Sequence, residues 1–115
     1  MMHVTYSDKS LVVGDEIAAL LVEYAAALGR DGSADSVTVH AIGADGGEVE
    51  ATFLLNGGIA LMAETTNTTV PEPDNDHVVA EVREKLAALT RTYEVAAAEA
   101  DVADHADWDD FAERS

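Results

Sequence analysis

Two glutamates and a histidine are the residues of this sequence whose types and spacing could support catalysis. Glu50 and Glu64 belong to two alternating runs that flank a glycine-rich turn, and His40 lies in the run before them. If these runs pair as neighbouring strands, Glu50 and Glu64 become cross-strand neighbours on the outer sheet face, with His40 one row away. Two close carboxylates push their pKa values apart and can divide the roles of acid and base. Together with a histidine they could also bind a metal ion.

The surroundings of these residues argue against both forms of chemistry. Glutamates on a solvated sheet face point apart into water, whereas a catalytic site needs a concave, enclosing pocket that the pattern does not indicate. The remaining histidines, His3, His77 and His105, do not pair at zinc-site spacing. Gly43–Gly47 and Gly57-Gly58 are expected to join antiparallel strands, which is typical of turns and not of phosphate-binding loops. The sequence therefore predicts a non-enzymatic protein with no metal and no cofactor.

One motif near the C-terminus is typical of a docking peptide. Trp108, the only tryptophan, and Phe111 lie three residues apart, so one helical turn would put both rings on the same side. Asp107, Asp109 and Asp110 surround them, and acidic segments with aromatic residues can dock into basic, apolar-lined grooves. These five residues are the candidate partner-binding site. The alternative is that Trp108 folds back on the domain, or that the tail only keeps the protein soluble.

The charge of the chain excludes several classes of partner. Acidic residues number 23 against six basic ones, which gives a formal net charge of −17. Such a charge repels nucleic-acid phosphates and anionic membranes, so neither is an expected partner. Two explanations stay open, namely solubility, including adaptation to a salty cytoplasm, and binding of a basic partner, for which mimicry of a nucleic acid is one form. The chain has no cysteine, no signal-peptide pattern and no apolar run of membrane-spanning length, so the expected location is cytoplasmic.

Two helices are expected to position these residues. The first has Asp15 as its N-cap, ends in the stretch Gly29–Gly32, and carries an apolar stripe of Ile17, Leu20, Leu21, Tyr24 and Leu28. The second begins near His77 and carries Val79, Val82, Leu86, Leu89 and Tyr93. From Glu94 onward eight acidic residues face one base. The chain is therefore predicted to consist of a domain, residues 1–93, and an acidic, partly helical tail, residues 94–115.

Strands are expected in two parts of the chain. Residues 2–6 form a short strand, and residues 11–13 are either a second strand or the lead-in to the first helix. A three-stranded meander follows, with strands at residues 37–42, 48–55 and 59–66. Three-residue bulged turns, Asp45-Gly46-Gly47 and Asn56-Gly57-Gly58, are expected to join them. Two-residue turns would place the apolar sets of paired strands on opposite faces of the sheet. Gly47 is expected in the left-handed conformation.

The resulting fold class is α+β, an antiparallel three- to four-stranded meander with two helices packed on one face and an acidic tail. The predicted core is Val4, Ile17, Leu20, Leu21, Tyr24, Leu28, Val37, Val39, Phe53, Leu55, Ile59, Leu61, Val79, Val82, Leu86 and Leu89. The outer face gathers Ile42, Leu54 and Met62, beside His40, Glu50 and Glu64. A moderate apolar patch of this kind is typical of dimerisation, so these six residues are the candidate self-association face.

Two functions follow from these observations. The favoured one is a small cytoplasmic interaction protein, such as an adaptor, an inhibitor or an immunity-type protein, that binds a basic or apolar protein partner. The alternative is a dimeric ligand-binding or enzymatic domain. Its site would lie at the subunit interface on the outer sheet face, lined by His40, Thr52 and Glu64.

Overall fold

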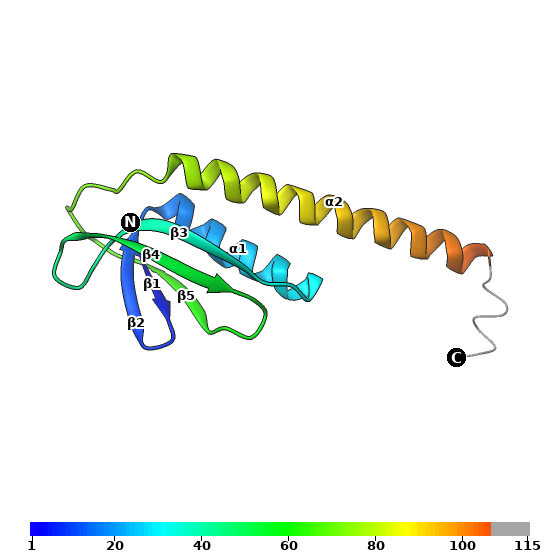
Figure 1. Cartoon of the computed structure of the whole chain (residues 1–115), viewed down its shortest axis with the longest axis horizontal. Coiled ribbons are helices and arrows are strands. Elements are labelled where there is room, and N and C mark those ends of the chain that lie inside the picture. The colour runs from blue at the N-terminus through cyan, green and yellow to red at the C-terminus, as the bar shows by residue number, and fades with distance from the viewer. Residues whose placement is uncertain (107–115) are drawn as a thin grey trace.

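The computed structural model describes residues 1–106, with side chains described through Arg91. Its elements are, in chain order, β1 (Met2–Tyr6), β2 (Lys9–Val13), α1 (Asp15–Asp31), β3 (Asp35–Ile42), β4 (Glu48–Leu55), β5 (Leu61–Thr65) and α2 (Asp76–Ala106). The five strands form one antiparallel sheet in the order β4-β3-β2-β1-β5, with α2 packed along α1 (Figure 1). The predicted α+β class is confirmed, but the sheet has more strands than expected and is not a meander.

The N-terminal residues form a complete hairpin, which settles the question left open for residues 11–13. Val4 of β1 lies opposite Leu11 of β2, and Met2 lies opposite Val13. The hairpin turns at Ser7, whose φ of 58° is the positive value that the first position of a two-residue hairpin turn requires. Val4, Leu11 and Val13 are all buried, so this short apolar run is a core strand.

The predicted hairpin of β3 and β4 is present in a different register. Val37 lies opposite Phe53 and not Leu55, because the connecting loop spans Gly43–Gly47 and is longer than the predicted three residues. The Gly43 N–H donates to the Gly47 carbonyl at 2.8 Å, and Gly46, not Gly47, has the positive φ. A register difference of two residues leaves each side chain on its predicted face, so the predicted core of this hairpin survives.

The predicted pairing of β4 with β5 is wrong. These strands lie at opposite edges of the sheet, and β5 pairs with β1, where Val4 lies opposite Ala63. The connection between β4 and β5 passes the end of α1, where a Cβ on Gly57 would lie 2.9 Å from the Gly29 Cα. Of the two glycines that suggested a tight turn, Gly57 is thus needed for a close approach of two backbones.

The sheet is curled, so that the end of β4 meets the end of β1. The Tyr6 hydroxyl donates to the Leu54 carbonyl at 2.8 Å, and the Tyr6 ring lies edge-on to Phe53 with 5.7 Å between centroids. β2 and β3 pair at Val12 and Ile42. Beyond this pair the hairpin of β3 and β4 diverges from β1 and β2. Figure 1 shows β3 and β4 running along α1, whereas β1 and β2 cross the direction of α1.

Helix α2 lies along the part of β3 that β2 does not reach. The Asn75 side chain accepts a hydrogen bond from the His40 N–H and donates one to the His40 carbonyl, both at 2.8 Å. Further along, Lys85 pairs with Asp35 at 3.0 Å. The helical stretch from Asn75 to Lys85 covers about 15 Å, and the strand from Asp35 to His40 covers about 17 Å. The two elements therefore run antiparallel side by side.

The helices bury the residues that their periodicity predicts, with corrections at the ends. Asp15 is the first helical residue of α1 and not its cap, which is Gly14; a Cβ on Gly14 would lie 2.6 Å from the Glu72 carboxylate. Gly32 caps the C-terminus with a φ of 70°, as predicted, whereas Gly29 lies within the helix. The backbone of α2 continues to Ala106, through the predicted boundary at residue 93, and the division into domain and tail stays a prediction.

The core lies between α1, the inner face of the sheet and the first turns of α2. Most of the predicted core residues are buried, and four of them are partly buried and pack against the core: Ile59, Leu61, Leu86 and Leu89. The residues 1–106 contain no helix that is apolar over a length able to cross a lipid bilayer.

Candidate functional site

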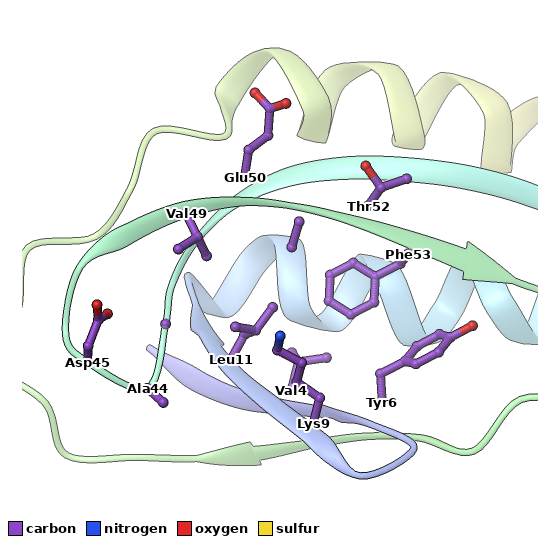
Figure 2. A pocket seen from close by; sticks show the side chains of 12 residues that line it. Val4, Tyr6, Lys9, Leu11, Ala44, Asp45, Val49, Glu50, Thr52 and Phe53 are labelled. Atoms are coloured by element: carbon purple, nitrogen blue, oxygen red, sulfur yellow. The ribbon is translucent and has the colours of Figure 1, made fainter.

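The divergence of the two hairpins leaves an apolar pocket between β4 and the inner face of β1 and β2. Its volume is about 540 Å³. Val4 and Leu11 line it from the first hairpin, and Val49, Ala51 and Phe53 line it from β4 (Figure 2). The contact between Tyr6 and the end of β4 closes the pocket at one end. The pocket therefore exists because the sheet closes on itself at one end only.

One wall of the pocket is the backbone of an edge strand. Glu50 and Thr52 line the pocket, yet Figure 2 shows their side chains pointing away from it, so their main chain forms the wall. Backbone groups along an antiparallel strand point alternately toward the partner strand and away from it. Counting from the bonded Gly43–Gly47 pair, Glu50 and Thr52 direct their N–H and C=O groups away from β3. The bond that Leu54 accepts from Tyr6 agrees with this alternation.

Acidic side chains surround this wall. Among the residues that line the pocket, Asp45 and Glu50 are acidic and Lys9 is basic. Glu48, also on β4, is exposed on the same side of the strand as Glu50. The Asp45 carboxylate accepts the Gly47 N–H at 3.0 Å and so holds the loop beside the pocket. The site combines apolar inner surfaces with carboxylates along its β4 border.

The residues predicted for acid–base or metal chemistry are not brought together. Glu50 lies opposite His40 on β4 and β3, whereas Glu64 lies opposite His3 at the other edge of the sheet. In the part of the chain that the structure describes, no three potential ligand residues are grouped in a way that could bind a metal ion. The predicted cross-strand glutamate pair depended on the wrong pairing of β4 with β5.

The six residues of the predicted self-association face lie on three strands, β3, β4 and β5. Leu54 and Met62 are each 52% exposed, but they lie on β4 and β5, at opposite edges of the sheet. Ile42 is only 8% exposed. Self-association through these six residues stays a prediction.

The predicted docking motif lies outside the described residues. Trp108, Phe111 and the aspartates Asp107, Asp109 and Asp110 all follow Ala106, at which α2 ends. Their role in partner binding stays a prediction.

A polar cluster joins α1, β3 and α2 away from the pocket. The Tyr24 hydroxyl donates to the Asp35 carboxylate at 2.7 Å, and the Lys85 ammonium contacts the same oxygen at 3.0 Å. The hydrogen bond from Tyr24, followed by that from Lys85, holds the pKa of Asp35 below its ordinary value, although burial opposes this shift. Burial raises the pKa of Tyr24, and the hydrogen bond of Tyr24 to Asp35 adds to that shift. The separate hydrogen bond of Lys85 to Asp35 raises the pKa of Lys85. These three groups bond one another and so hold α2 against α1 and β3, and none of them lines the pocket described above.

A second hollow, of about 400 Å³, lies between α1 and the connection of β4 to β5. It is lined by small and aliphatic residues that include Ala26, Ile59 and Gly57, with Arg30 at its border. It lacks the combination of free strand edge and carboxylates found at the first pocket.

Sequence reasoning missed the pocket because it placed β4 in the interior of the sheet. One signal could have placed it correctly. Glu48 and Glu50 alternate with Val49 and Ala51, and charged residues along a strand are typical of a sheet edge.

Comparisons of the chain with protein-family models, with curated proteins and with solved structures find no match.

Proposed function

We propose that this chain is a non-enzymatic protein-interaction module that binds a basic, partly apolar segment of another protein. The observation that carries the proposal is the apolar pocket of about 540 Å³ on a chain with a net charge of −17. Pockets of roughly 300–1,000 Å³ are typical of ligand-binding sites. A strongly negative surface raises the local concentration of cationic partners and speeds their association.

In this proposal the pocket accepts apolar side chains of the partner, and the carboxylates of β4 and of the neighbouring loop attract its lysines and arginines. The acidic residues after Ala106, with Trp108 and Phe111, would add a second contact to the same partner. The role would be that of an adaptor, an inhibitor or an immunity-type protein, acting in the cytoplasm. The alternative, a dimeric ligand-binding or enzymatic domain with its site on the outer sheet face, draws no support from this geometry, because His40 and Glu64 lie on separated strands.

The test is selection from a displayed library of random peptides, followed by binding of the enriched peptides by fluorescence anisotropy. The expected peptides contain aliphatic or aromatic residues flanked by lysine or arginine, and they bind more weakly as salt is raised. Two substitutions on β4 that leave the net charge unchanged locate the site. Val49→Ser, at the pocket, should weaken binding about tenfold, whereas Leu54→Ser, exposed on the other face, should leave it unchanged.

Enrichment of acidic peptides, or equal effects of the two substitutions, would contradict the proposal. Circular dichroism of both variants verifies that they fold, which is expected because Val49 and Leu54 are both exposed.

A further inference from the structure

The edge of β4 that borders the pocket has the features of a site for strand addition. Glu48, Glu50 and Thr52 turn their backbone N–H and C=O groups outward, and two of these residues line the pocket through their main chain. A strand placed beside β4 would therefore have backbone partners on one side. Its alternate side chains would lie over the pocket, between β4 and the inner residues Val4 and Leu11.

From this arrangement we infer that the partner segment binds as an extended strand, antiparallel to β4, and becomes the sixth strand of the sheet. The inference rests on the proposed function and specifies how that site recognises its partner. Residues of β4 alternate between the inward set Val49, Ala51 and Phe53 and the outward set Glu48, Glu50 and Thr52. The segment that fits has apolar residues facing inward and lysine or arginine facing Glu48 and Glu50.

Two features of the structure limit the length of this segment. At one end the Leu54 carbonyl already accepts a hydrogen bond from the Tyr6 hydroxyl, and at the other end β4 joins the loop Gly43–Gly47. The open edge therefore runs from Glu48 to Thr52, a span of about 14 Å as a strand. A segment of about five residues fills it.

The same edge is poorly suited to a second copy of this chain. Antiparallel pairing of two β4 strands about a two-fold axis would bring Glu48 and Glu50 of each copy together on one sheet face. Like charges in cross-strand positions are destabilising, and charged residues on an edge are a known means of preventing self-pairing. The glutamates thus select a basic segment against a copy of the chain itself.

The experiment uses the full chain and three synthetic peptides, namely acetyl-KVKLKVK-amide and two forms of it that are methylated on backbone nitrogens. The parent is compared with two isomers that carry N-methyl groups, either on the backbone nitrogens of two internal lysines or on those of two aliphatic residues. All three peptides have the same charge. In an antiparallel pair, lysines opposite Glu50 and its neighbours on the same face exchange backbone bonds with β4, while the N–H groups of the aliphatic residues point away.

The expected result is a loss of binding of about tenfold or more for the lysine-methylated isomer, because its pairing bonds are blocked. The aliphatic-methylated isomer should bind within about twofold of the parent. Amide hydrogen exchange at Glu50 and Thr52, followed by NMR, should slow when the parent peptide is added, while that at Val22 on α1 should not change.

Several outcomes would overturn the inference. Equal binding of the two isomers would mean attraction by charge without strand pairing, and the opposite preference would exclude an antiparallel strand. No binding of the parent at millimolar concentration and low salt would also overturn it. None of these outcomes decides the proposed function, because the peptide selection can still yield basic, apolar ligands whose binding depends on Val49.

Discussion

Asp35 ties three elements together. It lies at the start of β3, accepts a hydrogen bond from Tyr24 of α1 and pairs with Lys85 of α2. Lys85 also lies 3.5 Å from Glu81 on the same helix, which adds a weaker attraction. Since Tyr24 is almost fully buried, its hydroxyl needs this carboxylate as a partner, and the position of α2 depends on the same oxygen.

The substitution Asp35→Asn should lower the free energy of unfolding by about 1 kcal/mol at neutral pH, a modest value because Lys85 and Asp35 are partly exposed. The pKa of Asp35 is lowered in the folded chain, so its contribution is present above the unfolded pKa and is lost as the pH falls through the folded one. The pKa values of Tyr24 and Lys85 are raised, so their contributions are lost only in alkaline solution. The difference between the two proteins should therefore stay constant from about pH 5 to pH 9 and shrink below about pH 4.

Urea denaturation at a series of pH values measures this difference. The control is Glu84→Gln, which removes an exposed acid from α2. A stability difference for Asp35→Asn that grows toward acidic pH would contradict the expected sign.

At the scale of elements, Asn75 takes the place of a strand residue. Its amide bonds both backbone groups of His40, as a residue of a neighbouring strand would, on the side of β3 where β2 has ended. The Asn75 carbonyl also accepts the Val79 N–H at 2.8 Å and so begins α2. One residue thus ends the sheet and starts the helix.

The substitution Asn75→Ala should destabilise the chain by about 2–3 kcal/mol, because it leaves the N–H and C=O groups of the partly buried His40 without these partners. Asn75→Asp should lower the stability by at least as much, since a carboxylate oxygen would then face the His40 carbonyl. The matched control is Asp74→Ala, which removes the bond from the Asp76 N–H and should cost only about 0.5–1 kcal/mol. Thermal unfolding followed by circular dichroism gives the ranking, and a cost for Asp74→Ala equal to that for Asn75→Ala would refute this role.

Elements that depend on local sequence could be predicted, and those that depend on distant contacts could not. The stripe from Ile17 to Leu28 and the hairpin of β3 and β4 follow from periodicity and turn residues close in the chain. The partner of β5 does not, because the alternation of its residues puts Leu61 and Ala63 on one face whether the neighbouring strand is β4 or β1. In the structure Gly57 lies close to Gly29, and β1 pairs with β2 (Lys9–Val13) on one side and with β5 on the other, so the arrangement involves contacts between residues far apart in the sequence. The pocket was missed for the same reason, since it requires β4 to be an edge.

At the scale of the whole molecule, the net charge of −17 opposes the compact state. Salt screens repulsion between exposed carboxylates, with a screening length of about 10 Å at 0.1 M and about 3 Å at 1 M. The melting temperature should therefore rise by several degrees when KCl is increased from about 0.01 M to about 0.5 M.

A variant with fewer exposed acids provides the matched control for this effect. Glu48→Gln, Glu50→Gln and Glu84→Gln together reduce the repulsion without touching the core, so this variant should show a smaller rise. Differential scanning calorimetry measures both proteins. A melting temperature that is unchanged or falls with KCl would show that self-repulsion does not limit stability.

The pairing of β1 with β5 has a consequence for how the chain is made. β1 is synthesised first, and its hairpin with β2 can form at once, yet its other edge must wait for β5, whose Ala63 lies opposite Val4. During that interval a growing chain on the ribosome carries two open strand edges, one on β1 and one on β4. Contacts between residues so distant in the sequence form slowly. Of the five described strands, β5 is made last and completes the sheet, and nascent chains that stop before Thr65 should be the ones most in need of a chaperone.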